Sequence, residues 1–333
     1  MRLHGLDAAR FLAFFGMVLV NFRIAAKVVA DTSWASVLTD HLEGRAAALF
    51  VILAGIGLAL GDPNRAVLFK RAMFLFVIGM LNLIIFEADI LHFYALYFCI
   101  AIPFINARTW IILGLGFVTM AINLVFMFTL NFEAGWNWDT LEYSDFWTII
   151  GFVRHSFFNG WHPVFPWIAF LFFGLCLGRQ DLGNRQVQIW LVVGGLCLAT
   201  SVSIAQAMLD PALWAAQVLT LAPIPPNPAY ILASIGSAIA VIGLILLLTP
   251  WIERSLIFRA IVSAGRQALT LYILHILVGM GVLEYFDLLN GTLTSLEIFT
   301  FSIAFCAICV LYSVLWTRFI SRGPLEWVMR KLT

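Results

Sequence analysis

Two residues three positions apart, Asp89 and His92, form the pair in this sequence best suited to acid–base chemistry. On one helix, positions i and i+3 share a face, so the carboxylate could orient the imidazole and raise its basicity, as in a hydrolase triad. The alternative is structural: Asp89 caps the N-terminus of a helix, and His92 is a hydrogen-bonded residue of a helix bundle. The sequence leaves both interpretations open.

Two further segments place acidic, basic and imidazole side chains directly before apolar runs. They hold, in chain order, His41, Glu43, Arg45, Arg154, His155 and His162. Ionisable groups at membrane depth are costly, so each of these residues is a candidate for function. A solvated helix end is the simpler explanation of His41 and Glu43. Together with Asp89 and His92, three separate segments bring acid–base groups to one end of the predicted helices.

The composition indicates which kind of protein must position these residues. Hydrophobic residues make up 62% of the sequence and charged residues 11%, whereas soluble globular proteins have about 45–50% and about 25%. A formal net charge of +1 provides no basic field for nucleic acid. The five cysteines lie in apolar runs, which argues against a disulfide framework or a zinc cluster, and we expect no metal. The sequence therefore predicts an integral membrane protein surrounded by lipids.

Ten apolar runs are candidates to cross a bilayer, whose core of about 30 Å requires roughly 20 helical residues. They lie at 8–25, 45–60, 67–86, 90–106, 109–130, 163–178, 187–208, 228–249, 261–282 and 296–317. We therefore expect an all-α polytopic fold of about ten transmembrane helices in a single domain, 1–333. A proline-rich outer connection divides it into helix groups at 1–208 and 228–333.

Basic residues are distributed unequally over the connections between these runs. Fifteen of the nineteen lysines and arginines fall on one side, and only Arg23, Lys27, Arg45 and Arg154 fall on the other. The positive-inside rule then places both termini in the cytoplasm.

Asn21, inside the first run, is a candidate for substrate binding or for a hydrogen bond between helices.

Six short motifs are spread over nearly the whole chain. They are Leu6-Asp7-Ala8-Ala9-Arg10, Gly44-Arg45, Asp89-Ile90-Leu91-His92, His162-Pro163-Val164-Phe165-Pro166-Trp167, Gly265-Arg266-Gln267-Ala268-Leu269-Thr270-Leu271-Tyr272 and Gly323-Pro324-Leu325-Glu326-Trp327. Their order resembles the heparan-alpha-glucosaminide N-acetyltransferase-like and YeiB-like family of membrane proteins. The resemblance implies transfer of an acyl group, in the first instance acetyl, from cytoplasmic acyl-CoA to an extracytoplasmic saccharide or glycolipid. It also favours the cytoplasmic (inner) membrane of a bacterium.

Acyl transfer needs a base for the acceptor and donors that stabilise the oxyanion. We predict His92 as the base and Asp89 as its orienting group. The resemblance implies a catalytic histidine in the first extracytoplasmic loop, where this sequence has only His41, and Glu43 lies beside it. Substrate binding is assigned to Arg45, Asn21, Arg154, His155 and His162. The coenzyme phosphates are assigned to Arg10, Arg71 and Arg266, which could equally be residues that set topology.

A different class of protein would use the same residues. In a transporter or flippase, buried histidines and carboxylates bind protons or the head group of a small or lipid-linked substrate. For the enzyme, both direct transfer and an acyl-histidine intermediate are open. The sequence also leaves a homo-oligomer open.

Overall fold

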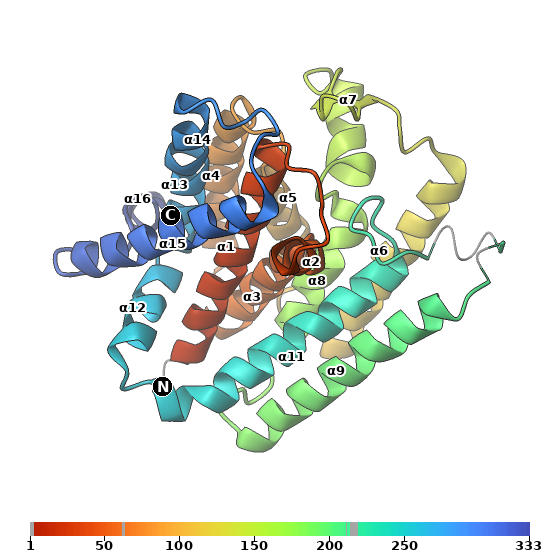
Figure 1. Ribbon diagram of the computed structural model, residues 1–333. Coiled ribbons are helices and arrows are strands. Elements are labelled where there is room, and N and C mark those ends of the chain that lie inside the picture. Colours follow the sequence, from red (N-terminus) through yellow and green to blue (C-terminus); the bar gives the residue numbers. More distant parts are fainter. Residues whose placement is uncertain (1–2, 62–63, 211, 214–218) are drawn as a thin grey trace. The chain divides into compact units, whose positions relative to one another are not determined.

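The computed structural model describes residues 3–61, 64–210, 212–213 and 219–333 (Figure 1). Within these ranges the regular secondary structure is helical, apart from one small antiparallel hairpin. The hairpin pairs β1 (Trp136–Asn137) with β2 (Glu142–Tyr143). The expectation of an all-α fold is therefore confirmed.

Eight helices, or nine if a bent pair counts as one span, are long and apolar enough to cross a membrane among the described residues. The eight are α1 (His4–Ala25), α2 with α3 (Trp34–Leu42 and Arg45–Gly61), α4 (Arg65–Leu83), α6 (Thr109–Thr129), α9 (Arg185–Ala207), α11 (Pro228–Ile252), α13 through η3 to α14 (Ala268–Leu274, His275–Met280 and Gly281–Tyr285) and α15 (Ser295–Thr317). The bent pair joins α7 and η2 (Ile149–Arg154 and His155–Asn159) to α8 (Val164–Leu177) at an angle of 50°. The chain is an integral membrane protein.

Two of the expected runs differ from the structure. The run at 90–106 forms α5 (Leu91–Ala101) and the 3-10 helix η1 (Ile102–Phe104), which together are shorter than the other spans. Pro103 lies in the first turn of η1, where it lacks the backbone N–H that would continue an α-helix. The run at 261–282 is interrupted, because α12 (Leu256–Gly265) ends before α13 begins at Ala268.

The chain folds into two compact units. The first unit contains Met1–Phe50, Leu182–Val193 and Ala238–Leu332, and the second contains Val51–Asp181 and Gly194–Ser237. These boundaries do not coincide with the proline-rich connection. The expected helix groups at 1–208 and 228–333 stay a prediction.

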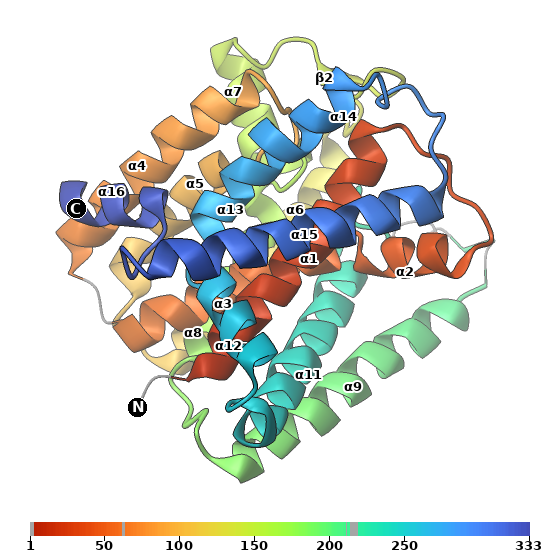
Figure 2. The same cartoon turned by 60° about the vertical axis from the view of Figure 1, so that its left-hand side comes forward.

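In the first unit, α1 packs against α2, α12, α13 and α15 (Figure 2). The approach of α12 is closest at Gly265, where an added Cβ would lie 1.8 Å from the carbonyl oxygen of Asp7. Only glycine fits this contact. Just beyond it, the carboxylate of Glu326, on α16 (Pro324–Leu332), accepts hydrogen bonds from the backbone N–H groups of Leu269 and Thr270. These bonds satisfy free N–H groups at the start of α13.

In the second unit, α4 packs against α5, and α6 packs against α8. The polar segments that connect these helices carry the candidate site.

Candidate functional site

Asp89 and His92 are fully buried at the start of α5. The Oδ2 atom of Asp89 accepts a hydrogen bond from the backbone N–H of His92, at 3.1 Å, and lies 3.1 Å from Nδ1 of the His92 ring. The Oδ1 atom accepts from Nδ2 of Asn82, at 2.7 Å. One carboxylate therefore accepts from a backbone N–H in the first turn of α5 and also contacts the imidazole, although Ile90 and not Asp89 is the N-cap residue.

The hydrogen bond to Asp89 selects the tautomer of His92 that carries its proton on Nδ1. In that tautomer Nε2 has a free lone pair. This Nε2 atom is buried, and it has no hydrogen-bond partner among the described residues. His92 is thus prepared to accept a proton, or to act as a nucleophile, at Nε2.

The close packing of α4 against α5 depends on Gly79. An added Cβ at this position would lie 2.4 Å from the backbone N of His92 and 2.9 Å from Oδ2 of Asp89. No side chain fits there without moving the pair. Gly79 was not identified from the sequence, because a glycine within an apolar run gives no signal of what it contacts.

Two more imidazoles lie close to His92 in the second unit. The ring of His155 stacks near that of His92, with 5.9 Å between centroids and an angle of 22° between planes. The centroid of the Phe93 ring lies 5.4 Å from that of His155 and 5.9 Å from that of His162. We call Asp89, His92, His155 and His162 the histidine cluster. His155 also begins the π-helical turn η2, a feature that occurs frequently at functional sites.

The connection between α6 and α7 is held against this cluster by a hydrogen-bond chain. The Nε–H of Arg154 donates to the hydroxyl oxygen of Tyr143, at 2.7 Å, and the Tyr143 hydroxyl donates to Oδ1 of Asn159, at 2.7 Å. Arg154 also pairs with Asp145, at 2.5 Å. Burial raises the pKa of Tyr143, which keeps its proton available for this donation. The guanidinium of Arg154, predicted to bind substrate, is thus engaged within the connection.

His162 lies in the break between η2 and α8. Its ring is 4.5 Å from that of Trp167, and its carbonyl oxygen accepts a hydrogen bond from Tyr97, at 2.5 Å. Its Nδ1 atom is buried and has no hydrogen-bond partner among the described residues. Tryptophans surround the cluster further, since the ring of Trp136 lies 5.9 Å from that of His155 and 5.5 Å from that of Trp161.

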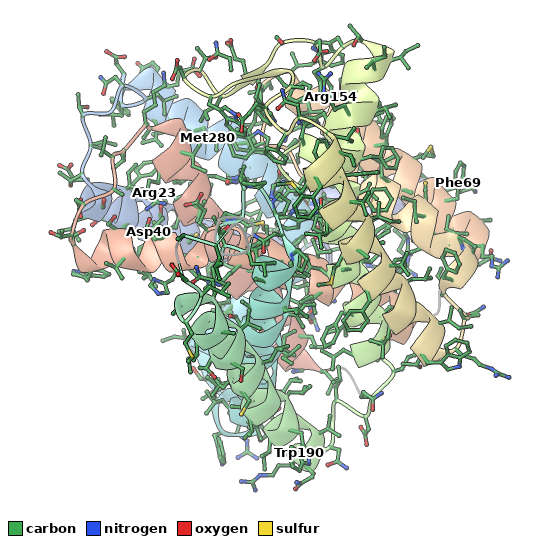
Figure 3. The ribbon with its side chains drawn as sticks, turned by 90° about the vertical axis from the view of Figure 1, so that its right-hand side faces the viewer. Arg23, Asp40, Phe69, Arg154, Trp190 and Met280 are labelled. Carbon is green, nitrogen blue, oxygen red and sulfur yellow. The ribbon has the colours of Figure 1, made fainter. Side chains whose placement is uncertain are left out.

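A second polar group lies in the first unit. The buried guanidinium of Arg23 binds the carboxylates of Asp40, at 2.5 Å, and Glu43, at 2.9 Å (Figure 3). We call these three residues the ion-pair group. The sequence analysis singled out Glu43 and used Arg23 only to judge topology, because the separation of Arg23 from Glu43 along the chain gives no sign of their contact.

The remaining candidates of this region lie at the end of α2 and the start of α3. His41 is exposed, and its Nδ1 atom is 2.8 Å from the carbonyl oxygen of Val37. Arg45 begins α3, and its guanidinium donates to the carbonyl oxygen of His41, at 3.0 Å. The expectation that Glu43 and Arg45 lie at the same end of the helices as Asp89 and His92 combines residues of both units and stays a prediction.

Asn21 pairs with His275 in the interior of the first unit. Nδ2 of Asn21 lies 3.0 Å from Nε2 of His275, which is fully buried at the start of the π-helical turn η3. The contact joins α1 to η3, as expected of an asparagine that hydrogen-bonds between helices.

The three arginines assigned to coenzyme phosphates have different environments. Arg10 donates to the buried carboxylate of Asp7, at 2.6 Å, and Nε of Arg266 lies 3.6 Å from the same carboxylate. Both belong to the first unit. Arg71 lies on α4 in the second unit and is half-buried.

The sequence was also compared with known families. Residues 2–192, more than half of the chain, match the model of the family described as "Heparan-alpha-glucosaminide N-acetyltransferase, catalytic". The chain belongs to this N-acetyltransferase family. Residues 177–333 match a second model, "Protein of unknown function (DUF418)". A segment of 90 residues is 34% identical to the uncharacterized protein YeiB of Escherichia coli (strain K12) and covers 25% of this chain and 22% of that relative.

The histidine cluster and the ion-pair group both lie within the segment that matches the N-acetyltransferase family. Arg266 and His275 lie in the segment that matches the family of unknown function. The motifs quoted from the sequence thus belong to two family segments, which overlap at residues 177–192.

Proposed function

We propose that the protein is a membrane acetyltransferase that moves an acetyl group from cytoplasmic acetyl-CoA to an extracytoplasmic acceptor, a saccharide or glycolipid. Membership of the N-acetyltransferase family and the membrane-spanning helices support this assignment. The observation that carries it is the buried, unpartnered Nε2 of His92, whose ring is oriented by Asp89. A base held in this way suits activation of a weak nucleophile.

The proposed reaction begins when Nε2 of His92 removes the proton from an acceptor hydroxyl or amine. The acceptor atom attacks the thioester carbonyl carbon, and the resulting tetrahedral intermediate expels the thiolate of CoA. The imidazolium then returns its proton to that thiolate, so the base is regenerated. Asp89 stabilises the imidazolium in between, while Asn82 holds the other carboxylate oxygen. An acyl-histidine route would use the same Nε2 as the nucleophile.

A saccharide acceptor agrees with the aromatic surroundings of the cluster. Trp136, Trp161 and Trp167 lie around His155 and His162. The Nε1 atoms of Trp161 and Trp167 are buried and have no hydrogen-bond partner among the described residues. Tryptophan offers an apolar face to a sugar ring and one N–H donor to a hydroxyl.

We further propose the ten-span topology, with both termini in the cytoplasm and the protein in a bacterial cytoplasmic membrane. The bent pair would form one span, and α5 with η1 would form one short span. The unequal distribution of basic residues supports this orientation.

The decisive experiment incubates the purified full-length protein with radiolabelled acetyl-CoA and a panel of amino sugars, neutral glycans and glycolipids. Label transferred to an acceptor supports the enzyme, and label on the protein alone supports the acyl-histidine route. A reaction without protein corrects for spontaneous acetylation.

One observation also favours a transporter, because a buried carboxylate–imidazole pair can bind and release a proton. Proton-dependent uptake of substrate into vesicles, with no acetyl transfer to any acceptor, would show that the protein is a transporter and not an acetyltransferase.

A further inference from the structure

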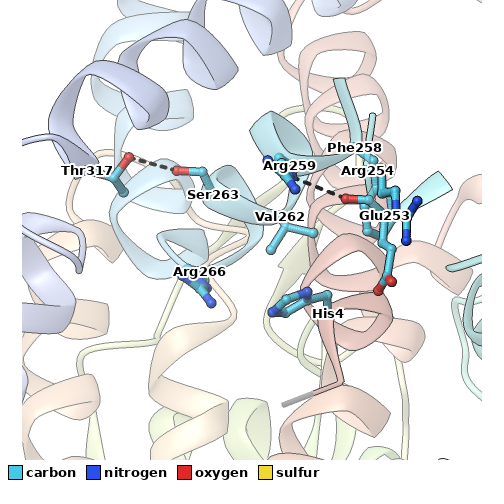
Figure 4. Close-up of a pocket in the computed structure, with 9 residues that line it drawn as sticks. All are labelled: His4, Glu253, Arg254, Phe258, Arg259, Val262, Ser263, Arg266 and Thr317. Carbon is cyan, nitrogen blue, oxygen red and sulfur yellow. Dashed lines mark hydrogen bonds between the residues drawn. The ribbon is translucent and has the colours of Figure 1, made fainter. Parts of the chain in front are cut away.

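A cavity of about 560 Å³ opens in the first unit. It is formed by the start of α1, the turn between α11 and α12, α12 itself and the end of α15 (Figure 4). Its size is in the range of small-molecule sites, which is about 300–1,000 Å³.

The lining of this cavity is strongly basic. Arg254, Arg259 and Arg266 face one acidic residue, Glu253. Figure 4 shows Arg259 and Arg266 along α12, Glu253 and Arg254 in the turn before it, and His4 at the start of α1. Among the described residues, no carboxylate pairs with the guanidinium of Arg254 or Arg259, both of which are exposed. Two arginines thus keep their charge available for a ligand.

Arg266 lies next to the carboxylate of Asp7. Its Nε atom lies 3.6 Å from Oδ2 of Asp7, while Arg10 occupies Oδ1 of the same carboxylate at 2.6 Å. One carboxylate charge is therefore shared between two guanidinium groups. At this distance the contact is not a hydrogen bond, and the buried Nε of Arg266 has no hydrogen-bond partner among the described residues.

Two hydroxyl groups, those of Ser263 and Thr317, complete the lining. The Oγ of Ser263 lies 3.1 Å from the carbonyl oxygen of Ser313 and 3.2 Å from Oγ1 of Thr317. Ser263 and Thr317 both line the cavity. Because both hydroxyls donate to backbone carbonyl oxygens, the guanidinium groups are the donors for a ligand, and arginine binds phosphate oxygens through two parallel N–H bonds.

We propose that this pocket, which we call the arginine pocket, binds the phosphate groups of an anionic ligand. Two sources carry that chemistry: the diphosphate of a nucleotide-bearing coenzyme and the head group of an anionic phospholipid. The phosphate site does not depend on the proposed acetyl transfer. Its use for a coenzyme does rest on the proposed function, since acetyl-CoA is the proposed donor. The phosphates of CoA belong to its nucleotide part.

The test measures binding to the full-length protein in detergent micelles with three probes. CoA carries the phosphates, pantetheine lacks them, and phosphatidylglycerol presents one in a lipid. We expect CoA, phosphatidylglycerol or both to bind, and pantetheine to bind much more weakly than CoA. Arg254→Gln and Arg259→Gln should each weaken binding on the order of 10-fold, since a charge-assisted contact is lost. Both side chains are exposed, so folding should be preserved.

Arg65→Gln is the matched control, since Arg65 is an exposed arginine on α4 in the other unit. Equal affinities of the control and the Arg254→Gln, Arg259→Gln double variant for CoA and phosphatidylglycerol would overturn the proposal. Arginine-dependent phosphate binding without acetyl transfer would support the arginine pocket and count against the enzyme. If the double variant kept both its acetyl transfer and its binding of CoA and phosphatidylglycerol, the enzyme would be supported and the arginine pocket would be rejected.

Discussion

The Oδ2 atom of Asp89 lies 3.1 Å from two nitrogens of His92, the backbone N and the ring Nδ1. A single oxygen therefore fixes the start of α5 and the tautomer of the imidazole. Because Oδ1 is held by Asn82 at 2.7 Å, the carboxylate cannot turn without losing a bond at one end or the other.

Asp89→Asn tests this double role. Both oxygens of Asp89 accept from N–H groups, so either orientation of an asparagine amide would set its NH₂ against a donor. We expect turnover to fall about 10- to 100-fold, as for other residues that orient a functional imidazole. Thermal unfolding in detergent should also shift to lower temperature. Asp139→Asn, in an exposed turn, is the control. Turnover equal to that of the wild type in Asp89→Asn would show that Asp89 does not orient the imidazole for catalysis.

Gly79→Ala should displace the pair through packing alone. Its Cβ would lie 2.4 Å from the backbone N of His92, so we expect a loss of about 1–3 kcal/mol of stability. Gly114→Ala is the matched control, because nothing lies within 4 Å of a Cβ there. That substitution should be neutral or slightly stabilising. Unfolding curves of the two variants in the same detergent provide the comparison, and equal shifts would contradict the close contact.

Arg23→Gln should weaken the first unit. It leaves the carboxylates of Asp40 and Glu43 next to each other without their shared cation. Because both carboxylates are partly exposed, the expected cost is about 1–2 kcal/mol. Asp40→Asn should recover part of that loss in the double variant, since one repelling charge is then removed. Full additivity of the two substitutions would show that the ion-pair group is not energetically coupled.

Glu326 should make the stability of the first unit depend on pH. Burial raises the pKa of its carboxyl above the ordinary value of 4.5, although hydrogen bonds from Thr270 oppose the shift. The folded state therefore holds a proton that the unfolded state releases, and stability falls as the pH rises from 4.5 through the raised pKa. Glu326→Gln resembles the protonated form, so it should match the wild type at low pH and exceed it above that window. Melting curves of both proteins from pH 4.5 to 7.5 measure this. A difference in stability between Glu326→Gln and the wild type that stayed constant over this range would contradict the prediction.

Much of the fold followed from the sequence because bilayer helices need long apolar runs, and these are visible without tertiary information. The predicted helix boundaries are wrong where a proline or a close backbone contact interrupts an apolar run. Pro103 ends the helical run after Leu91 early, and the contact of Gly265 with Asp7 accompanies the break before Ala268. Neither interruption appears in hydropathy.

The site was predictable only where its partners are neighbours in sequence. Asp89 and His92 were paired from their spacing, and the structure confirms their contact. Arg23 and Glu43 are 20 residues apart, and their pairing depends on how α1 meets the end of α2. Of the arginine pocket, only Arg266 was among the residues assigned to phosphates, because Arg254 and Arg259 resemble topology-setting charges in the sequence.

The central claim is that His92 is the catalytic base, and turnover of His92→Ala tests it most directly. We expect a loss on the order of 10²–10⁴-fold with acetyl-CoA binding largely preserved, because the imidazole acts mainly in the transition state. His92→Gln, which keeps hydrogen-bonding capacity but cannot act as a base, should be nearly as impaired, and thermal unfolding measured alongside separates catalysis from folding. A stable and fully active His92→Ala protein, with activity lost instead in His41→Ala, would contradict the assignment.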